Sequence, residues 1–403
     1  MTTNDMTTEI LIIGGGITGT STAYFLTQAG HEVTLIERKE LASEASGLNA
    51  GTLWQIGWGT SPDLSSTLSM GGLEIFEKLQ SDLGYDIEFC QSGALKAIQT
   101  EEELDFLQKE VQHLKTLGYC VEILSTRDAQ SIEPELSSEL FGCLHYPLGG
   151  SANPVKTTQA LASAAQKRGA CILTNYEVIS IQYLDNTCYK VVTSKGIFQT
   201  QTLVLAAGPW CRDIGYMLNL HIPVFSVRGQ MWSTGPVPTH LFRAFGAAES
   251  TLYWHRNSHS NKDIPPELTH DENVRHTRHL YGRQTLEGEI IFGGDRQLTQ
   301  NKTPDEAGIE ANRNHVIEIF PFLRQYPITR TWAGLMPFTA NLEPIIGTIA
   351  QYDNLFIVTG SGSSGFEQGP MAGKLLAEFI HNSQALPILS SANPMLHVTH
   401  MTL

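Results

Sequence analysis

Residues 9–37 read EILIIGGGITGTSTAYFLTQAGHEVTLIE, and this stretch decides the fold class. It opens with a short apolar run that predicts a buried parallel strand. The glycine-rich turn GGGITG follows, and residues 20–30 then have the spacing of a helix that ends at Gly30. Residues 31–37 predict a second strand, which ends at Glu37. A strand, a glycine turn, a helix and a second strand in this order predict an α/β protein with a Rossmann-like unit.

The glycine turn has the spacing G-x-G-x-x-G, formed by Gly14, Gly16 and Gly19. In a dinucleotide site the first glycine allows a tight turn, the second lets the backbone approach a pyrophosphate, and the third lets the helix pack on the strand. The helix N-terminus attracts phosphates, and a carboxylate at Glu37 suits a ribose diol. The motif therefore predicts a dinucleotide site, although a glycine-rich turn without a ligand has the same spacing. It does not distinguish FAD from NAD.

Length, charge and cysteine use narrow the class of protein. A chain of 403 residues is too long for one compact core and predicts two domains. The formal charge of -15 argues against a nucleic acid or an anionic membrane as partner. No apolar run approaches the ~20 residues of a membrane span, and the first residues lack a signal-peptide pattern. The six cysteines are scattered and are interpreted as reduced thiols, so we expect a cytoplasmic protein.

Three further stretches favour FAD over a nicotinamide cofactor. After Glu37 the chain continues into a loop of small residues, ASGLNAG at 45–51, where a nicotinamide-binding unit would continue to another strand. A large planar ring can lie close to the backbone of such a loop. Within residues 177–210, EVISIQYL, YKVVTS and GIFQTQ alternate like antiparallel strands, and TLVLAAGPW predicts a buried strand that ends in a glycine turn.

Residues 354–380 form the third stretch, NLFIVTGSGSSGFEQGPMAGKLLAEFI. It predicts a strand, a glycine loop and a helix, with Pro370 at the first helical position. The N-terminus of such a helix would stabilise the negative charge that develops on the N1–C2 edge of a reduced flavin. This stretch therefore also suits a flavin.

Together, these segments resemble the D-amino-acid oxidase and glycine oxidase family of flavoenzymes, which also includes sarcosine oxidase and D-amino-acid dehydrogenases. The resemblance covers nearly the whole chain. Beyond the segments above, it rests on SGALKAIQTEEE (92–103), IEPEL (132–136), VRGQMW (227–232) and WAGLMPF (332–338). It implies an FAD-dependent oxidoreductase with a discontinuous two-domain fold, in which a Rossmann-like FAD-binding domain is joined to an antiparallel-sheet substrate domain.

The resemblance also implies where the two domains divide. The FAD-binding domain would take residues 1–85, 145–220 and 330–403. The substrate domain would take residues 86–144 and 221–329, and its sheet would cover one face of the flavin.

The cofactor contacts follow from the resemblance residue by residue. The N-terminal glycines would cradle the pyrophosphate, Glu37 would hold the adenosine ribose, and Val178 would meet the adenine through its backbone. For each glycine, a turn requirement is the alternative explanation. Relatives with covalent flavin use a cysteine in the segment that here reads WAGLMPFTAN or a histidine near the ASGLNAG loop, and both are missing, so FAD is expected to be noncovalent. The complete set of expected contacts is Gly14, Gly16, Ile17, Thr18, Gly19, Glu37, Arg38, Ser46, Asn49, Ala50, Gly51, Val178, Ala207, Gly208, Trp210, Gly334, Gly362, Ser363, Gly365 and Phe366.

The chemistry implied by the resemblance is oxidation of a C–N bond of an amine or amino acid derivative. A hydride would pass to flavin N5, the imine would hydrolyse, and oxygen or another acceptor would take the electrons. Oxidation of a hydroxy acid or another C–OH substrate is the alternative within flavoenzymes. A nicotinamide dehydrogenase needs a second nucleotide site or a catalytic His/Lys constellation, and the sequence has neither. A flavin-binding protein without catalysis is the remaining class.

One position departs from the family pattern at the expected substrate site. Glycine oxidase and D-amino-acid oxidase relatives carry an arginine in a G-x-R-P turn, where it grips the substrate carboxylate. The corresponding stretch here is GLMP, with Met336 at the arginine position. Loss of such a buried contact costs on the order of 2–5 kcal/mol. Either another cation replaces it, with Arg283 and Arg330 as candidates, or the substrate lacks a carboxylate at this point. A structural role for Arg283 is equally open.

Residues 251–279 are long, polar and rich in histidine. Their spacing fits no standard metal motif, so we predict no metal site and expect a loop or lid over the substrate cavity. Tyr253, Trp254 and His255 are pocket candidates, with core packing on a sheet as the alternative. Glu343 is expected to be a solvated loop carboxylate, and contact with a cationic amine is its alternative role.

Overall fold

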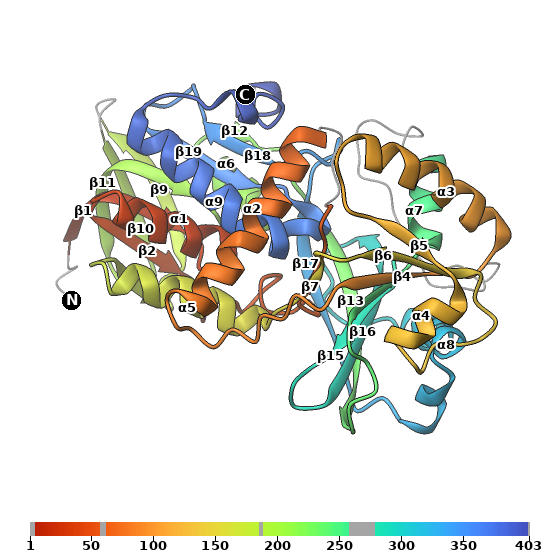
Figure 1. The fold of residues 1–403 in the computed structure, drawn as a ribbon. Helices are drawn as coiled ribbons and strands as arrows, with labels where there is room; N and C mark the ends of the chain where they lie inside the picture. The colour runs from red at the N-terminus through yellow and green to blue at the C-terminus, as the bar shows by residue number, and fades with distance from the viewer. Residues whose placement is uncertain (1–4, 57–61, 185–187, 258–278, 402–403) are drawn as a thin grey trace.

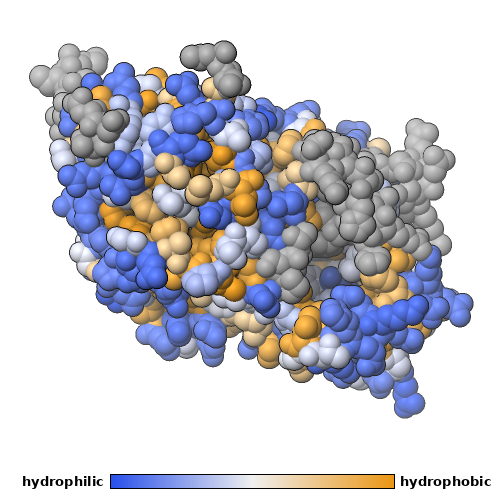
Figure 2. All heavy atoms as spheres, turned by 90° about the horizontal axis from the view of Figure 1, so that it is seen from above, coloured by the Kyte–Doolittle hydropathy of each residue, from blue (hydrophilic) through white to orange (hydrophobic). Residues whose placement is uncertain are grey.

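The computed structural model describes residues 5–56, 62–184, 188–257 and 279–401, and only the backbone of residues 5, 62 and 254–257. Two large sheets lie in neighbouring halves of the molecule, and helices pack around each (Figure 1). Seen from above, apolar residues gather toward the middle of the face, between hydrophilic ones (Figure 2). Within the described ranges, the structure contains no helix that is both long and apolar enough to cross a membrane. The predicted α/β class, with a Rossmann-like sheet and an additional sheet, is confirmed.

The first sheet has eight strands, and its central strands are parallel. Strand β1 pairs in parallel with β11 on one side and with β2 on the other, as a Rossmann-like unit requires. Strands β9 and β10 extend β11 in the antiparallel sense that their alternating sequence predicts. The strands are β1 (Asp5–Ile13), β2 (Val33–Glu37), β8 (Cys171–Thr174), β9 (Val178–Leu184), β10 (Cys188–Thr193), β11 (Ile197–Leu205), β18 (Ile345–Thr348) and β19 (Leu355–Thr359).

The segments GIFQTQ and TLVL, which were expected as two strands, form the single strand β11. This strand pairs with β1 along its whole length, from Asp5 opposite Ile197 to Ile13 opposite Leu205. Its first half also pairs with β10. The prediction of two separate strands is wrong. The alternating half of β11 pairs with β10 and its apolar half pairs with β19, so the sequence pattern changes with the neighbouring strand while the backbone continues without a turn.

Helices cover the first sheet and pack closely on one another. Gly369 and Gly373 of α9 lie against α1, where a Cβ at Gly373 would stand 2.8 Å from the Thr18 carbonyl oxygen. Pro370 lies inside α9 and not at its first position as predicted. The Pro370 carbonyl accepts a hydrogen bond from the Ser21 hydroxyl at 2.6 Å. These helices are α1 (Ile17–Gln28), α2 (Pro62–Ser81), α5 (Pro154–Gln166), α6 (Cys211–Tyr216) and α9 (Gly365–Asn382).

The second sheet also has eight strands, in the order β17-β13-β16-β15-β14-β4-β6-β5. Every neighbouring pair is antiparallel except β14 and β4. Its strands are β4 (Ala94–Ile98), β5 (Glu122–Leu124), β6 (Gly142–Tyr146), β13 (Phe225–Pro236), β14 (Ala244–Ala247), β15 (Tyr281–Gln284), β16 (Glu289–Leu298) and β17 (Arg330–Phe338). The helices of this half are α3 (Glu101–Thr116), α4 (Thr126–Ile132), α7 (Glu249–Asn257) and α8 (Glu306–Ile319). Two short pairs, β3 (Thr52–Leu53) with β7 (Gly150–Ser151) and β12 (Leu220–His221) with β20 (Thr399–His400), complete the strands described.

Strand β17 contains the stretch RTWAGLMPF, which the expected division of the chain assigned to the FAD-binding half. The strand pairs with β13 from Arg330 to Phe338, so it is the edge strand of the second sheet. Its last residue, Phe338, also bridges to Ser361 beyond the end of β19. β17 therefore connects the two halves, and the exact division into domains stays a proposal.

Candidate cofactor and substrate site

A cavity of about 380 Å³ is lined by residues from both halves of the molecule. On the side of the first sheet, its wall consists of the glycine turn after β1, the loop at 44–49, and the segments 206–210 and 358–367 that follow β11 and β19. On the other side, its wall includes residues of β4, β14, β15 and β17. The cavity therefore lies at the carboxyl ends of the parallel strands, which is where open α/β sheets bind ligands.

The glycine turn brings three backbone segments into direct contact. A Cβ at Gly14, where φ is +120°, would lie 2.4 Å from the Ala206 carbonyl oxygen, and a Cβ at Gly19 would lie 2.0 Å from the Gly14 carbonyl oxygen. Only glycine fits both positions. The Ser46 hydroxyl accepts a hydrogen bond from the Ile17 amide at 2.9 Å, which fixes the small-residue loop at the start of α1. The first residues of α1 line the cavity, and the hydrogen bond from Ile17 to Ser46 holds them against the small-residue loop. A helix N-terminus in this position can bind an anion.

One end of the cavity has the groups that suit an adenosine. The Glu37 carboxylate accepts hydrogen bonds from the Gly15 amide at 2.8 Å and the Lys39 amide at 2.9 Å, which holds it at the end of β2. The Arg38 guanidinium stacks 3.8 Å from the centre of the Trp210 ring. Val178 lines the same cavity. These residues form the part of the wall that was expected to receive the ribose and adenine.

Most of the expected cofactor contacts lie on the cavity wall. The exceptions are Gly19, Ala50 and Gly51. Gly19 lies behind Gly14, where its role is helix packing. Asn49 shapes the loop, because its side chain bonds to the Ala45 carbonyl and the Gly51 amide. The loop at 45–51 is therefore held both by its own hydrogen bonds and by its contact with α1.

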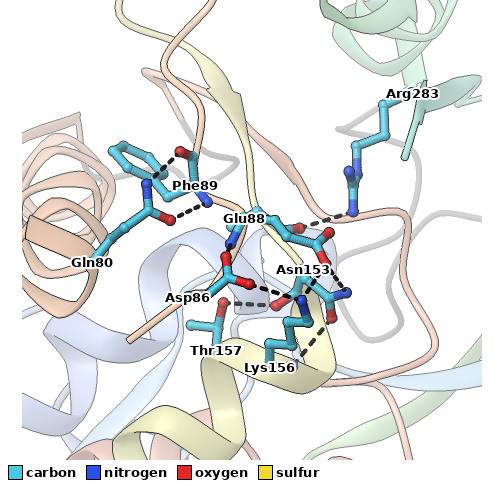
Figure 3. Close-up of polar contacts among 9 residues, drawn as sticks. Gln80, Asp86, Glu88, Phe89, Asn153, Lys156, Thr157 and Arg283 are labelled. Atoms are coloured by element: carbon cyan, nitrogen blue, oxygen red, sulfur yellow. Dashed lines mark hydrogen bonds and ion pairs between the residues drawn. The ribbon is translucent and has the colours of Figure 1, made fainter. Parts of the chain in front are cut away.

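Arg283 does not line the cavity, although it was one of the two candidate cations for a substrate carboxylate. The residue is 4% exposed, and its guanidinium donates to the carbonyl oxygens of Ala50 at 2.5 Å and Ala152 at 3.2 Å. Figure 3 shows the side chain reaching from β15 toward the loop with Glu88, whose carboxylate pairs with Lys156 at 2.7 Å. Both hydrogen bonds go to backbone carbonyl oxygens, as expected for the structural role that the sequence analysis gave as the alternative for Arg283.

Arg330 and Glu343 also lie away from the cavity wall. The Arg330 side chain is 57% exposed and pairs with Glu289 at 3.0 Å. Glu343 was expected to be solvated, and this is wrong, because it is 3% exposed. The turn after β17 folds inward, and the Ser391 hydroxyl approaches the Glu343 carboxylate at 3.5 Å.

The aromatic pocket candidates lie on a helix and not on a sheet. Tyr253, Trp254 and His255 belong to α7, and Tyr253 is not part of the cavity wall. The side chains of Trp254 and His255 lie outside the described residues, as does most of the histidine-rich segment that was expected to form a lid. In the part of the chain that is described, no group of three or more His, Cys, Asp or Glu side chains is arranged to hold a metal.

Met336 lies on the cavity wall, at the position where the family pattern has an arginine. The Ser363 hydroxyl lies 3.5 Å from its sulfur, and a Cβ at Gly229 would lie 3.0 Å from its terminal methyl group. The neighbouring Trp332 donates from its indole nitrogen to the Leu48 carbonyl at 2.9 Å. The strand is thus fixed against the small-residue loop, and Met336 contributes its thioether to the cavity wall.

Lys96, Tyr281 and Glu367 are among the polar wall residues that sequence reasoning did not single out, and it had placed His279 only within the histidine-rich segment. Lys96 is a charged residue inside the otherwise apolar strand ALKAI, a pattern that could have indicated a functional role. The other three could not be assigned to one site, because only the pairing of distant strands brings them to the cavity.

Glu367 lies in the first turn of α9 and is 3% exposed. Its carboxylate accepts a hydrogen bond from the Trp54 amide at 2.7 Å and lies 3.5 Å from the Ser69 hydroxyl. Burial raises the pKa of Glu367 to about 8, and the Trp54 amide and the Lys96 charge oppose this shift. The carboxyl group is therefore mainly protonated at neutral pH.

The sequence profile of the FAD-dependent oxidoreductases, the DAO family, matches residues 9–379. The chain belongs to this family. Glycine oxidase of Geobacillus kaustophilus (strain HTA426) is 26% identical over 382 residues, with 93% of each chain covered. D-amino acid dehydrogenase of Neisseria gonorrhoeae (strain NCCP11945) is 24% identical over 427 residues, with 92% of this chain and 95% of the relative covered. The crystal structure of L-proline dehydrogenase from P. horikoshii has a TM-score of 0.83 and 25% identity, and 97% of both chains is covered.

Membership of the FAD-dependent oxidoreductases confirms the resemblance seen in the motifs, and with it FAD as the cofactor. The glycine turn and the turn at 360–366 both line the one cavity described above.

Arg283→Met is expected to destabilise the flavin-loaded protein by about 3 kcal/mol, because two buried carbonyl oxygens lose their donor. Thermal unfolding followed by tryptophan fluorescence measures the effect. Arg330→Met is the matched control, and the loss of its exposed ion pair should cost less than about 1 kcal/mol. An unchanged unfolding midpoint for Arg283→Met, together with weaker binding of carboxylated substrates, would show that the structural assignment is wrong.

Glu367 also makes stability depend on pH. Its pKa is about 8 in the folded protein and 4.5 in a model peptide, so the folded state binds more protons between these values. Stability from this group is therefore lost as pH rises from 5 to 8, with a slope of at most about 1.4 kcal/mol per pH unit. Glu367→Gln should flatten the decline of the unfolding midpoint between pH 6 and 8, whereas Glu378→Gln, which changes an exposed carboxylate on the same helix, should not. Identical slopes in all three proteins would contradict the burial effect.

Proposed function

We propose that this FAD-dependent oxidoreductase oxidises a C–N bond of an amine or amino acid derivative, by hydride transfer to flavin N5 followed by hydrolysis of the imine. One observation carries the proposal: a single cavity joins the glycine turn of the dinucleotide site to a wall with Lys96, Tyr281 and Glu367. Glycine oxidase and D-amino acid dehydrogenase, the relatives named above, are enzymes of amino acids by their names. They support an amine function and leave the particular substrate open.

The proposed reaction balances in two steps. The substrate carbon loses a hydride with its electron pair and the nitrogen loses a proton, which leaves a C=N bond. Water then adds to the imine, and the products are a carbonyl compound and an amine or ammonia. When bound, FAD supplies the hydride acceptor, and oxygen or another acceptor reoxidises it. The task of the protein is to hold the amine at the right distance and to keep water away.

The residues present fit FAD. Gly14 allows the tight turn, Gly16 lines the cavity where the backbone can approach a pyrophosphate, and the Glu37 carboxylate stands at the end of β2. The turn at 360–365 precedes α9, an 18-residue helix whose N-terminus carries partial positive charge. These groups would hold the two phosphates, the ribose and the electron-rich edge of the ring.

Glu367 is placed to exchange the proton that the amine must lose. Its carboxyl group lies in the cavity wall, and a pKa of about 8 allows both protonation states near neutral pH. His279 is neutral, because burial and the charges of Arg296 and Lys96 lower its pKa well below 6.5. The cavity wall therefore provides Glu367, which can exchange a proton, and His279, which stays uncharged.

Met336 restricts the substrate that this part of the wall accepts. A thioether makes apolar contacts and only weak polar ones, so it does not neutralise a carboxylate. We propose that the substrate places an apolar group beside Met336, and that any carboxylate binds elsewhere in the cavity.

Anaerobic mixing of the flavin-loaded protein with a panel of amines tests the function. The panel comprises sarcosine, D-alanine, L-proline, glycine and benzylamine, with lactate and glycerol 3-phosphate as C–OH substrates. At least one amine is expected to bleach the visible absorption band of the flavin and to give one carbonyl product per flavin reduced. Bleaching by a C–OH substrate with failure of every amine would overturn the proposal in favour of the alternative chemistry.

A further inference from the structure

The segment 299–305, here called the strap, joins β16 to α8 and is held by two buried side chains of β13. The Arg228 guanidinium donates to the Thr303 carbonyl oxygen at 2.5 Å. The amide oxygen of Gln230 accepts a hydrogen bond from the Asp305 amide at 2.8 Å. Hydrogen bonds are stronger inside a protein than in water, so these two contacts fix the second part of the strap to the second sheet.

The first part of the strap is shaped by hydrogen bonds of its own. The Thr299 hydroxyl accepts from the Asn301 amide at 3.1 Å, and the Asn301 side chain accepts from the Thr303 amide at 2.9 Å. Short-range bonds of this kind, from Thr and Asn side chains to nearby amides, hold tight turns. Lys302 lies within this turn, so its side chain starts from a fixed backbone.

Lys302 reaches across to the first half of the molecule. Its Nζ lies 2.7 Å from Oε2 of Glu44, in the loop that follows β2. The other oxygen of this carboxylate lies 3.0 Å from a guanidinium nitrogen of Arg38 and 3.9 Å from the Lys39 ammonium. The side chain of Glu44 is 16% exposed and that of Lys302 is 38% exposed. Arg38 and Lys39 belong to the same half as Glu44, so among these three contacts that of Lys302 joins the two halves.

A second hollow, of about 300 Å³, lies beside this ion pair. Arg38, Glu44 and Trp210 line both the hollow and the main cavity, so the two spaces adjoin at the end that suits an adenosine. Lys302 lines the hollow but not the main cavity, and both Lys302 and Lys39 are exposed, so solvent reaches the hollow here. The Lys302–Glu44 pair therefore stands between solvent and the adenosine end of the cavity.

We propose that the Lys302–Glu44 ion pair is a clasp that retains FAD, and that FAD enters and leaves past this pair when it opens. The inference concerns retention of the cofactor and does not depend on which bond of the substrate is oxidised. It rests on noncovalent FAD, since a covalent flavin needs no clasp. A partly exposed ion pair is weak and is screened by salt, so the clasp slows release without preventing it.

The test is the rate at which FAD leaves the flavin-loaded protein after dilution, followed by separating free from bound flavin at timed intervals. Lys302→Met is expected to raise this rate about three- to fivefold, the range for loss of a partly exposed ion pair. Glu44→Gln should raise it as well. The double variant should release FAD no faster than the faster single variant, because both changes break one contact. At about 1 M salt, where the Debye length is about 3 Å, the difference between the wild-type protein and Lys302→Met should shrink.

The direction of the Glu44→Gln effect separates a clasp from simple attraction between charges. FAD is an anion, so without a clasp the loss of positive charge at Lys302 would speed release and the loss of negative charge at Glu44 would slow it. Lys39→Met is the matched control, because it removes the same charge beside the same carboxylate within one half of the molecule. It keeps the backbone amide that bonds to Glu37 and should change the rate by less than about 1.5-fold.

An unchanged or slower rate in Lys302→Met or in Glu44→Gln would overturn the inference, and so would an equal acceleration in Lys39→Met. Flavin that remains in the pellet after acid precipitation would also overturn it, because such a flavin is covalent. Failure of every amine in the substrate panel, with the expected release rates, would refute the proposed function alone.

Discussion

The contact between Gly14, Gly19 and Ala206 is the constraint on which the rest of the structure depends. Here the end of β1, the first turn of α1 and the end of β11 approach so closely that one additional carbon would stand 2.0 to 2.4 Å from a carbonyl oxygen. Because the three segments meet at one point, the N-terminus of α1 and the segment after β11 open onto the same cavity. The position of the cavity therefore follows from the packing of these three backbone segments.

The small-residue loop at 45–51 connects the glycine turn to the second sheet through hydrogen bonds. Ser46 ties the loop to the start of α1, Trp332 donates to the Leu48 carbonyl, and Arg283 donates to the Ala50 carbonyl. The last two residues come from β17 and β15, at different places in the second sheet. The loop is therefore held by hydrogen bonds from both halves of the molecule, and the buried Arg283 guanidinium makes one of them.

The sequence predicted those features that depend on short spacings. The G-x-G-x-x-G turn, the flanking strand and helix, and Glu37 lie within one local unit, so their arrangement could be inferred directly. The roles of Arg283 and Glu343 could not be predicted, because the sequence around a charged residue does not show whether its side chain contacts solvent, backbone or a ligand. Lys96 and Tyr281 are 185 positions apart, and only the register of β4, β14 and β15 brings them together. Pro370 was misplaced because the packing of α9 on α1 overrides a local preference.

The cofactor content of the purified protein tests the central claim most directly, which is that the cavity binds FAD through backbone packing at the glycine turn and without a covalent bond. After acid precipitation, FAD is expected in the supernatant at about one molecule per chain, as one dinucleotide site implies. Gly19→Val, which would force the Gly14 carbonyl away, should give a protein without bound flavin. Flavin retained in the acid pellet, or full FAD content in Gly19→Val, would contradict the account.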